Sequence, residues 1–352
     1  MQEIRRYLKR LSNSMNILYV GTFLSRKTGT KDVAEVLRDN IELYGFKINL
    51  VSKYENKLLR LMDIGRNILL YTGDTIIFNV FSGLAFKITE YGSFLAKLRN
   101  KKIIFILHGG ALPEYTRKNA ERVKKVFSRA DYIQTPSLFL NEFFCKSGYD
   151  VKYLPNSINL ENFKYSRSEV STCSILWVRA FTEIYNPQIA IDVLKSVKSI
   201  FPLATLTMVG PDKGLLEVIK QKTAELGLED SVKFIGPVPN EELYKYYQSH
   251  AVYLNTTSFE SFGMAVVEAA ACGIPIVSTS VGELPYLWTH KKDIMLVNSF
   301  NPKEFSTAVE EIFNDPKMAE RLSLNARKNI EKFQWENIRP QWIKLLETDG
   351  LK

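Results

Sequence analysis

Cysteine and histidine are scarce in this chain of 352 residues, which contains three of each. The cysteines are odd in number, widely spaced and set among apolar residues: Cys145, Cys173 and Cys272. We expect buried thiols of a reducing compartment, and the spacing excludes a disulfide framework or a cysteine zinc site. The histidines are equally scattered, so the sequence predicts neither a metal cluster nor a bound cofactor.

A signal peptide and a membrane-spanning run are also missing. No N-terminal segment combines an apolar core with a small-residue cleavage site. The most apolar stretch, residues 262–279, is interrupted by a glutamate, glycines and a proline. A spanning helix instead needs about 20 continuous apolar residues. These absences predict a cytoplasmic protein.

Positive charge is concentrated in the first half of the chain. Residues 1–160 contain 26 Lys and Arg against 14 Asp and Glu, a net charge of +12, whereas residues 161–352 contain 21 against 24, a net of −3. This indicates an anionic membrane surface, an anionic substrate, nucleic acid or simply a solvated surface. Without a nucleic-acid-binding motif, nucleic acid is the weakest alternative. The basic, amphipathic segment 1–14 is either a short interfacial helix, or a frayed extension or helix packed on the domain.

Short apolar segments of strand length alternate with segments of helical periodicity, which predicts parallel sheets buried on both faces. Strands are expected at 16–21, 47–52, 75–80, 102–107 and 132–136, then at 174–179, 204–210, 232–236, 251–256, 274–279 and 294–298. We therefore predict an α/β protein with two Rossmann-like, doubly wound domains, 1–158 and 159–334, and ligands bound in a cleft between them. An amphipathic helix at 335–352 is expected to pack back on the first domain.

The segment 259–279, FESFGMAVVEAAACGIPIVST, has the pattern of a binding site. A helix is expected from Met264 to Cys272, and its N-terminus suits a phosphate. Glu260 precedes this helix and Glu268 lies one turn inside it. Carboxylates accept hydrogen bonds from hydroxyl groups, so the pair suits the sugar and the ribose of a sugar nucleotide. The alternative is an exposed cap residue and a solvent-facing helix residue.

This segment resembles the Glu-x7-Glu signature of retaining GT-B-fold glycosyltransferases (glycosyl transferases group 1, family 4-like). Other matching segments follow in the expected order: LPNSIN (154–159), MVGPD (208–212), FIGPV (234–238) and FQWE (333–336). The first half matches more loosely, through Gly21-Thr22-Phe23 and His108-Gly109. The resemblance implies a GT-B fold and metal-independent transfer of a sugar from a nucleotide donor to an acceptor hydroxyl, with retention of configuration.

The resemblance also implies a role for each matched residue. Glu260 contacts the donor sugar, Glu268 holds the ribose, and Arg179 binds the diphosphate. His108 lies near the C6 region of the sugar and the acceptor. The remaining implied donor-binding residues are Phe262, Gly263, Met264, Gly210 and Gly236. Structural alternatives stay open for Arg179, as a salt bridge, and for His108, as a core residue.

One feature departs from the family pattern. A lysine that usually follows the arginine as a second diphosphate contact is missing between Arg179 and Pro187. Its absence costs several kcal/mol of transition-state stabilisation unless another group replaces it. Asn186, the helix N-terminus near Pro187 and Lys213 are the alternatives.

The glycine loop GTFLSRKTGT (21–30) matches neither the Gly-x-Gly-x-x-Gly motif nor a P-loop. As an acceptor-side loop it would present Gly21, Thr22, Arg26 and Lys27 to an anionic acceptor; the alternative is an ordinary basic turn. The sequence thus favours a lipid-linked or glycan acceptor at the inner membrane face, in polysaccharide or glycolipid synthesis. A nucleotide-binding relative without turnover and a GT-B sugar-nucleotide epimerase are the rival hypotheses.

Overall fold

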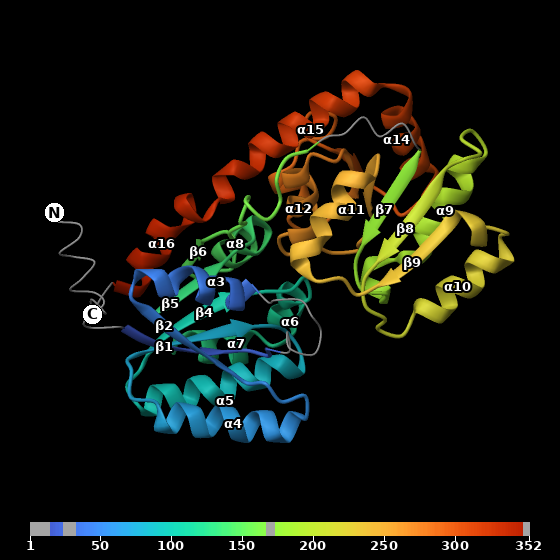
Figure 1. The fold of residues 1–352 in the computed structure, drawn as a ribbon. Coiled ribbons are helices and arrows are strands. Elements are labelled where there is room, and N and C mark those ends of the chain that lie inside the picture. Colours follow the sequence, from blue (N-terminus) through green and yellow to red (C-terminus); the bar gives the residue numbers. More distant parts are fainter. Residues whose placement is uncertain (1–14, 24–32, 167–172, 348–352) are drawn as a thin grey trace, which may run out of the picture. The chain divides into compact units, whose positions relative to one another are not determined.

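The computed structural model describes residues 15–23, 33–166 and 173–347, which form two compact units (Figure 1). Unit 1 comprises the described residues up to Ser157 together with 335–347. Unit 2 comprises the described residues from Ile158 to Gln334. No helix in the described part of the chain combines the length and the apolar character that crossing a bilayer requires.

Unit 1 is built on six parallel strands in the order β2-β1-β3-β4-β5-β6. The strands are β1 (Met15–Val20), β2 (Phe46–Val51), β3 (Thr75–Val80), β4 (Lys102–Leu107), β5 (Tyr132–Thr135) and β6 (Val151–Tyr153). The helices are α3 (Val33–Ile41), α4 (Lys57–Leu70), α5 (Leu84–Leu98), α6 (Leu112–Lys118), α7 (Ala120–Phe127) and α8 (Leu138–Lys146). The winding reverses between β1 and β3, whose carboxyl ends are the usual ligand position in such sheets.

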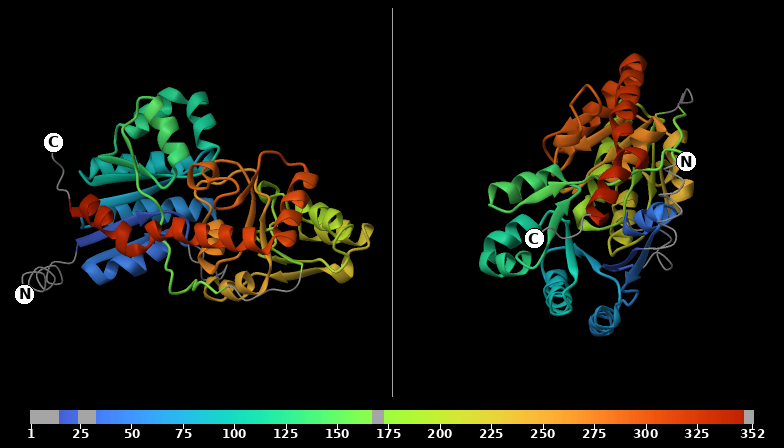
Figure 2. Two further views of the ribbon diagram at one scale, coloured as in Figure 1. Left: turned by 90° about the horizontal axis from the view of Figure 1, so that it is seen from above. Right: turned by 90° about the vertical axis from the view of Figure 1, so that its left-hand side faces the viewer.

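Helices cover both faces of this sheet (Figures 1 and 2), which explains why β3 and β4 are almost entirely apolar. Helices α4 to α8 pack against one face. On the other face α3 is joined by α16 (Trp335–Glu347), which inserts Trp335, Ile338, Trp342 and Leu346 into the core. The Nζ of Lys102 also donates a hydrogen bond to the Leu345 carbonyl at 2.9 Å. The last described helix is therefore part of unit 1.

Unit 2 has a second sheet of six parallel strands, in the order β12-β11-β10-β7-β8-β9. The strands are β7 (Ser174–Val178), β8 (Thr205–Val209), β9 (Val232–Gly236), β10 (Val252–Asn255), β11 (Ile276–Thr279) and β12 (Met295–Val297). The helices are α9 (Pro187–Lys198), α10 (Leu216–Glu225), α11 (Leu243–Ser249), α12 (Met264–Cys272), α13 (Leu284–Leu287), α14 (Pro302–Asn314) and α15 (Pro316–Ile330). This is the strand order of a Rossmann fold, and the winding reverses between β7 and β10.

The predicted doubly wound α/β architecture is confirmed, and α12 begins and ends at the predicted residues. The sequence does not predict β6, because three residues are too few to show a strand period. The prediction of buried cysteines is wrong for Cys145, which is exposed, whereas Cys272 is buried and Cys173 is half-buried. Phe144 of α8 points into the core, and the helical turn to the next residue places Cys145 on the outer side.

Candidate functional site

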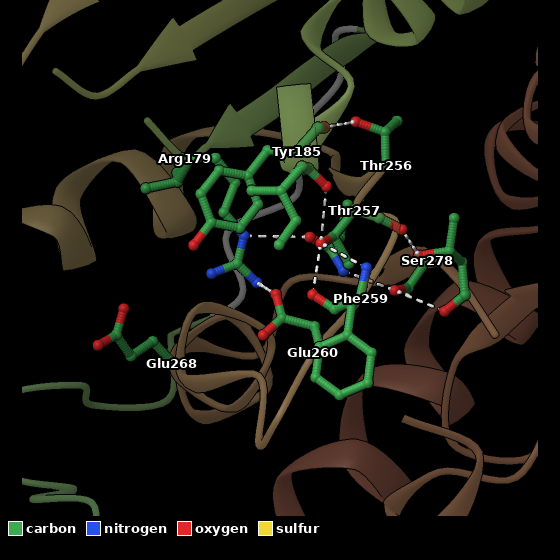
Figure 3. A network of polar contacts seen from close by, with 12 residues as sticks. Arg179, Tyr185, Thr256, Thr257, Phe259, Glu260, Glu268 and Ser278 are labelled. Carbon is green, nitrogen blue, oxygen red and sulfur yellow. Dashed lines mark hydrogen bonds and ion pairs between the residues drawn. The ribbon is translucent and has the colours of Figure 1, made fainter. Parts of the chain in front are cut away.

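Polar side chains gather in unit 2 where the winding reverses. β7 and β10 are neighbours in the sheet, and their carboxyl ends carry Arg179 and Asn255; Figure 3 shows Arg179 and the residues around it. The Nε of Arg179 donates to Oδ1 of Asn255 at 3.2 Å. Asn255 in turn donates to the hydroxyl of Ser278 at 2.9 Å, which ties the site to β11. The site thus lies at the ligand-binding edge of a Rossmann sheet.

Helix α12 begins directly beside this cluster. Gly263, at its N-cap, adopts a left-handed conformation with φ of 86°, which a residue with a side chain adopts only with strain. Gly273 ends the helix in the same conformation, φ 87°. The helix between them is alanine-rich and buried, and the Phe262 side chain packs edge-to-face on Phe333. The N–H groups of Val266 and Val267 donate to the Gly263 carbonyl, so the N–H groups at the very start of the helix, together with its dipole, have the features of an anion-binding position.

Arg179 and Glu260 form a buried ion pair. The Nη2 of Arg179 donates to Oε1 of Glu260 (Figure 3), and the side chains are only 11% and 10% exposed. Burial by itself would lower the pKa of Arg179, but the carboxylate and nearby tyrosines more than offset it, so the pKa lies above its usual value. Burial raises the pKa of Glu260, and the guanidinium partly reverses this rise. The alternative of an exposed cap residue is wrong for Glu260.

Glu268 lies apart from this pair, on α12, and is also buried. Its Oε1 accepts a hydrogen bond from Nδ2 of Asn240 at 3.1 Å, and its Oε2 accepts one from the hydroxyl of Tyr247 at 3.3 Å. Burial raises the pKa of Glu268 to about 7, although both hydrogen bonds and the charge of Arg179 act in the opposite direction. The alternative of a solvent-facing helix residue is therefore wrong for Glu268.

The loop after β7 shows which groups flank Arg179. The ring of Tyr185 lies 5.1 Å from the guanidinium carbon, in a cation–π arrangement (Figure 3). Asn186 has a left-handed backbone, φ 46°, and its side chain donates to the Thr256 carbonyl at 3.0 Å. Lys213 is exposed. Three groups are candidate substitutes for the missing lysine. The side chain of Asn186 is engaged in holding the loop to Thr256, and the N-terminus of α9 follows directly at Pro187.

Two predicted glycines shape the backbone at this edge. A Cβ at Gly210, φ 147°, would lie 1.9 Å from the carbonyl oxygen of Arg179, so only glycine fits there. The N–H of Gly210 also donates to the Gly236 carbonyl at 2.8 Å. Gly236 has φ of 81° and open space where a side chain would be. Gly210 thus lets the ends of β7 and β8 approach closely, whereas at Gly236 only the left-handed backbone favours glycine.

The sequence reasoning missed the turn after β11. The N–H of Glu283 donates to the Glu260 carbonyl at 2.9 Å. A Cβ at Gly282, φ 57°, would lie 2.1 Å from the same carbonyl oxygen. This turn therefore fixes the backbone of Glu260. The signal in the sequence is Gly-Glu-Leu-Pro shortly after an apolar strand, which is typical of a turn at a ligand-binding edge.

In unit 1, polar groups gather at the carboxyl ends of β1, β3 and β4. The Nε2 of His108 lies 3.0 Å from Oδ1 of Asn79, which also accepts from the Tyr19 hydroxyl at 2.8 Å. Phe81 stacks on the His108 ring with centroids 5.2 Å apart. Because Oδ1 is an acceptor, Nε2 carries the proton and Nδ1 is the acceptor. Burial lowers the pKa of His108 to about 4, so the ring is neutral at pH 7.

The glycine loop begins beside this group. The N–H of Gly21 donates to the Val51 carbonyl at 2.6 Å, and a Cβ there would lie 2.7 Å from the Phe23 ring. Thr22 is exposed. Arg26 and Lys27 lie outside the described residues. Tyr19, Asn79 and Phe81 were not predicted; a polar or aromatic residue near a strand's carboxyl end is the signal that points to them.

Several relatives carry one activity name. A D-inositol 3-phosphate glycosyltransferase of Corynebacterium urealyticum is 30% identical over 150 residues, 42% of this chain and 35% of that protein. One from Paenarthrobacter aurescens is 26% identical over 257 residues, 69% of this chain and 62% of that protein. The matched segments therefore span less than two thirds of these relatives.

Solved structures match almost the whole chain. HepE of Anabaena, in complex with UDP and glucose, has a TM-score of 0.75 at 18% identity and covers 95% of this chain and 100% of its own. Sucrose-phosphate synthase of Thermosynechococcus elongatus has a TM-score of 0.79 at 17% identity and covers 94% and 98%. These likenesses establish the two-domain GT-B fold. Residues 161–329, nearly all of unit 2, match the family model described as glycosyl transferases group 1.

Proposed function

We propose that this protein is a retaining glycosyltransferase that moves a sugar from a nucleotide-sugar donor to an acceptor hydroxyl. The observation that carries the proposal is a pair of buried carboxylates: Glu260, which precedes α12 and pairs with Arg179, and Glu268, which lies within α12. Buried charges at the ligand-binding edge of a sheet are costly for folding, and their retention there supports a binding role.

Each of these groups has a distinct task in the proposed reaction. The N–H groups at the start of α12 and the guanidinium of Arg179 stabilise the charge that develops on the departing diphosphate. Glu268 accepts hydrogen bonds from the ribose hydroxyls. Glu260, whose carboxylate is already held by Arg179, accepts one from a hydroxyl of the sugar and orients it. This pairing favours an orienting role for Glu260 over that of a free nucleophile.

We assign Tyr185 to the position left by the missing lysine. It directly precedes Asn186 and Pro187, where α9 begins, and its ring stacks on Arg179. In Figure 3 its hydroxyl lies on the same side as the tip of the guanidinium. A hydroxyl donor beside the arginine supplies a hydrogen bond to the diphosphate without adding charge.

For unit 1 we propose the acceptor role. Neutral His108 offers Nδ1 as a hydrogen-bond acceptor to an incoming hydroxyl, while Asn79 holds the ring by Nε2. The acceptor is proposed to be a lipid-linked or glycan precursor of a cell-surface polysaccharide or glycolipid, reached at the cytoplasmic side of an anionic membrane. Binding is proposed to need no metal. The inositol phosphate in the relatives' names makes small anionic polyols the first soluble acceptors to try.

The test is donor turnover across UDP-, GDP- and ADP-sugars, each with and without a membrane-lipid extract. HepE with UDP and glucose places UDP-glucose first in the panel. Nucleotide release that depends on the extract, with an α-linked product from an α-linked donor by NMR, is expected. Donor binding without release in any condition would favour a nucleotide-binding relative without turnover, which the missing lysine also suggests. Conversion of the donor without an acceptor would favour an epimerase.

A further inference from the structure

The outer surface of helices α4 and α5 in unit 1 is unusually apolar. On α4, Leu58, Met62 and Leu69 are 67%, 62% and 51% exposed. They are spaced by four and seven residues and so share one side of the helix. Ile64 and Ile68, on the opposite side, are fully buried in the core. Helix α4 therefore has two apolar sides: one packs in the core of unit 1, and the other is the exposed stripe.

Helix α5 repeats this arrangement. Leu84, Tyr91, Phe94 and Leu98 are between 40% and 64% exposed, at spacings of seven, three and four residues. Its inner side, which includes Phe86, is buried. Single exposed leucines are normal on a protein surface, but two neighbouring stripes of large apolar side chains mark an interaction surface.

The two stripes are continuous. A Cβ at Gly65 of α4 would lie 2.3 Å from the hydroxyl of Tyr91 of α5, so the helices touch where their exposed sides meet. The helices lie side by side in Figures 1 and 2, and no other helix or strand in the described part of unit 1 covers their outer side. With 14 and 15 residues, they extend for about 20 Å. We call this surface, with its seven apolar side chains, the α4–α5 face.

Positive charge surrounds these apolar residues. Residues 53–101 contain eight Lys and Arg against four Asp and Glu. The exposed cations on or next to the two helices are Lys57, Arg66, Lys87, Lys97 and Arg99. Of the two acids on the helices, Glu90 pairs with Arg122 of α7, whereas Asp63 accepts a hydrogen bond from the neutral Asn67 of its own helix and keeps its charge. The face is therefore both apolar and cationic.

We infer that the α4–α5 face docks on the surface of an anionic lipid bilayer. Leucine, methionine and aromatic side chains enter the headgroup boundary, while lysine and arginine reach the lipid phosphates from flexible stems. A second copy of the chain fits less well, since a symmetric contact would set the same cations against each other. The inference rests on the residues of this face and not on the proposed sugar transfer.

Vesicle flotation of the full chain, without donor, tests this inference. We expect binding to vesicles of phosphatidylcholine with about a third phosphatidylglycerol at about 150 mM NaCl, and little binding to phosphatidylcholine alone. The apolar variant Leu58→Gln, Met62→Gln, Leu69→Gln should lose at least about tenfold in partitioning. A charge variant, with Lys57, Arg66 and Lys87 changed to Gln, should lose about fivefold for each charge.

A matched control removes exposed apolar side chains from unit 2. Leu203, Val218 and Leu324 are 90%, 58% and 50% exposed, and their change to Gln should leave vesicle binding as in the wild type. Circular dichroism checks that each variant is folded. If the apolar variant is not folded, vesicle binding by the charge variant alone tests the inference. The inference is overturned if the wild type does not bind the anionic vesicles, or if it binds neutral vesicles equally well. It is also overturned if the apolar and charge variants bind as well as the wild type. A soluble dimer that only the face variants dissociate, without vesicle binding, overturns it as well.

Discussion

Replacing Glu268 by Gln should stabilise the protein at alkaline pH while it weakens nucleotide binding. The pKa of Glu268 is raised from 4.5 to about 7 by burial, so the folded state holds a proton that the unfolded state has released. The stabilisation from this proton is complete below about pH 4.5 and is lost as the pH rises through 7. At about 1.4 kcal/mol for each pH unit, the loss amounts to about 3 kcal/mol.

Glutamine has nearly the same shape and never ionises, so the variant should not show this loss. Urea unfolding of both proteins, followed by tryptophan fluorescence, should give similar free energies of unfolding near pH 4.5. Near pH 8 we expect the variant to be more stable by about 3 kcal/mol. The exposed Glu229→Gln serves as the control and should show no such trend. A difference between Glu268→Gln and wild type that is independent of pH would refute the reasoning.

Substitutions at three further residues test the site. Glu260→Gln should lower turnover about 10- to 100-fold, the value of one hydrogen bond to a charged group, while calorimetry shows nearly unchanged affinity for the nucleoside diphosphate; equal loss of both would contradict the orienting role. Tyr185→Phe keeps the stacking on Arg179 and should lower kcat about tenfold through the lost hydroxyl, whereas Tyr185→Ala should also weaken donor binding about tenfold; full activity in Tyr185→Phe would remove Tyr185 from the reaction. Gly210→Ala should lower the free energy of unfolding by more than about 2 kcal/mol, because its methyl group would meet the Arg179 carbonyl at 1.9 Å; an unchanged melting temperature would contradict this.

Local patterns predict much of this fold and of the candidate site in unit 2. Helix α12 is found to the residue because Gly263 and Gly273 mark both ends and every position between them is helix-compatible. The buried strands are found because both faces are covered, so their apolar runs are nearly unbroken. The strand β6 is missed because it has three residues.

Contacts between distant segments are not readable from such patterns. Nothing in the local sequence shows that Arg179 and Glu260, which are separated by 81 positions, form a hydrogen-bonded ion pair. The approach of Gly282 to the Glu260 backbone is likewise set by how two turns meet at the edge of the sheet. The placement of Tyr185 on the guanidinium depends on the left-handed turn at Asn186 in the same way. Sequence reasoning thus finds the chemical groups, and the fold decides which of them touch.

The ion pair of Arg179 and Glu260 has a consequence for the dependence of binding on salt. An arginine with its own internal counterion exerts little long-range attraction, so a diphosphate bound at the proposed site would be recognised at short range, by the dipoles at the start of α12 and by sharing of the guanidinium. Added salt should therefore change the affinity for the nucleotide only slightly. In the described part of the chain, the cations of the α4–α5 face form no ion pair with an acid of their own helices, and contact through that face should weaken steeply in the same salt. One titration with sodium chloride can thus distinguish nucleotide binding at the proposed site in unit 2 from contact made through the α4–α5 face.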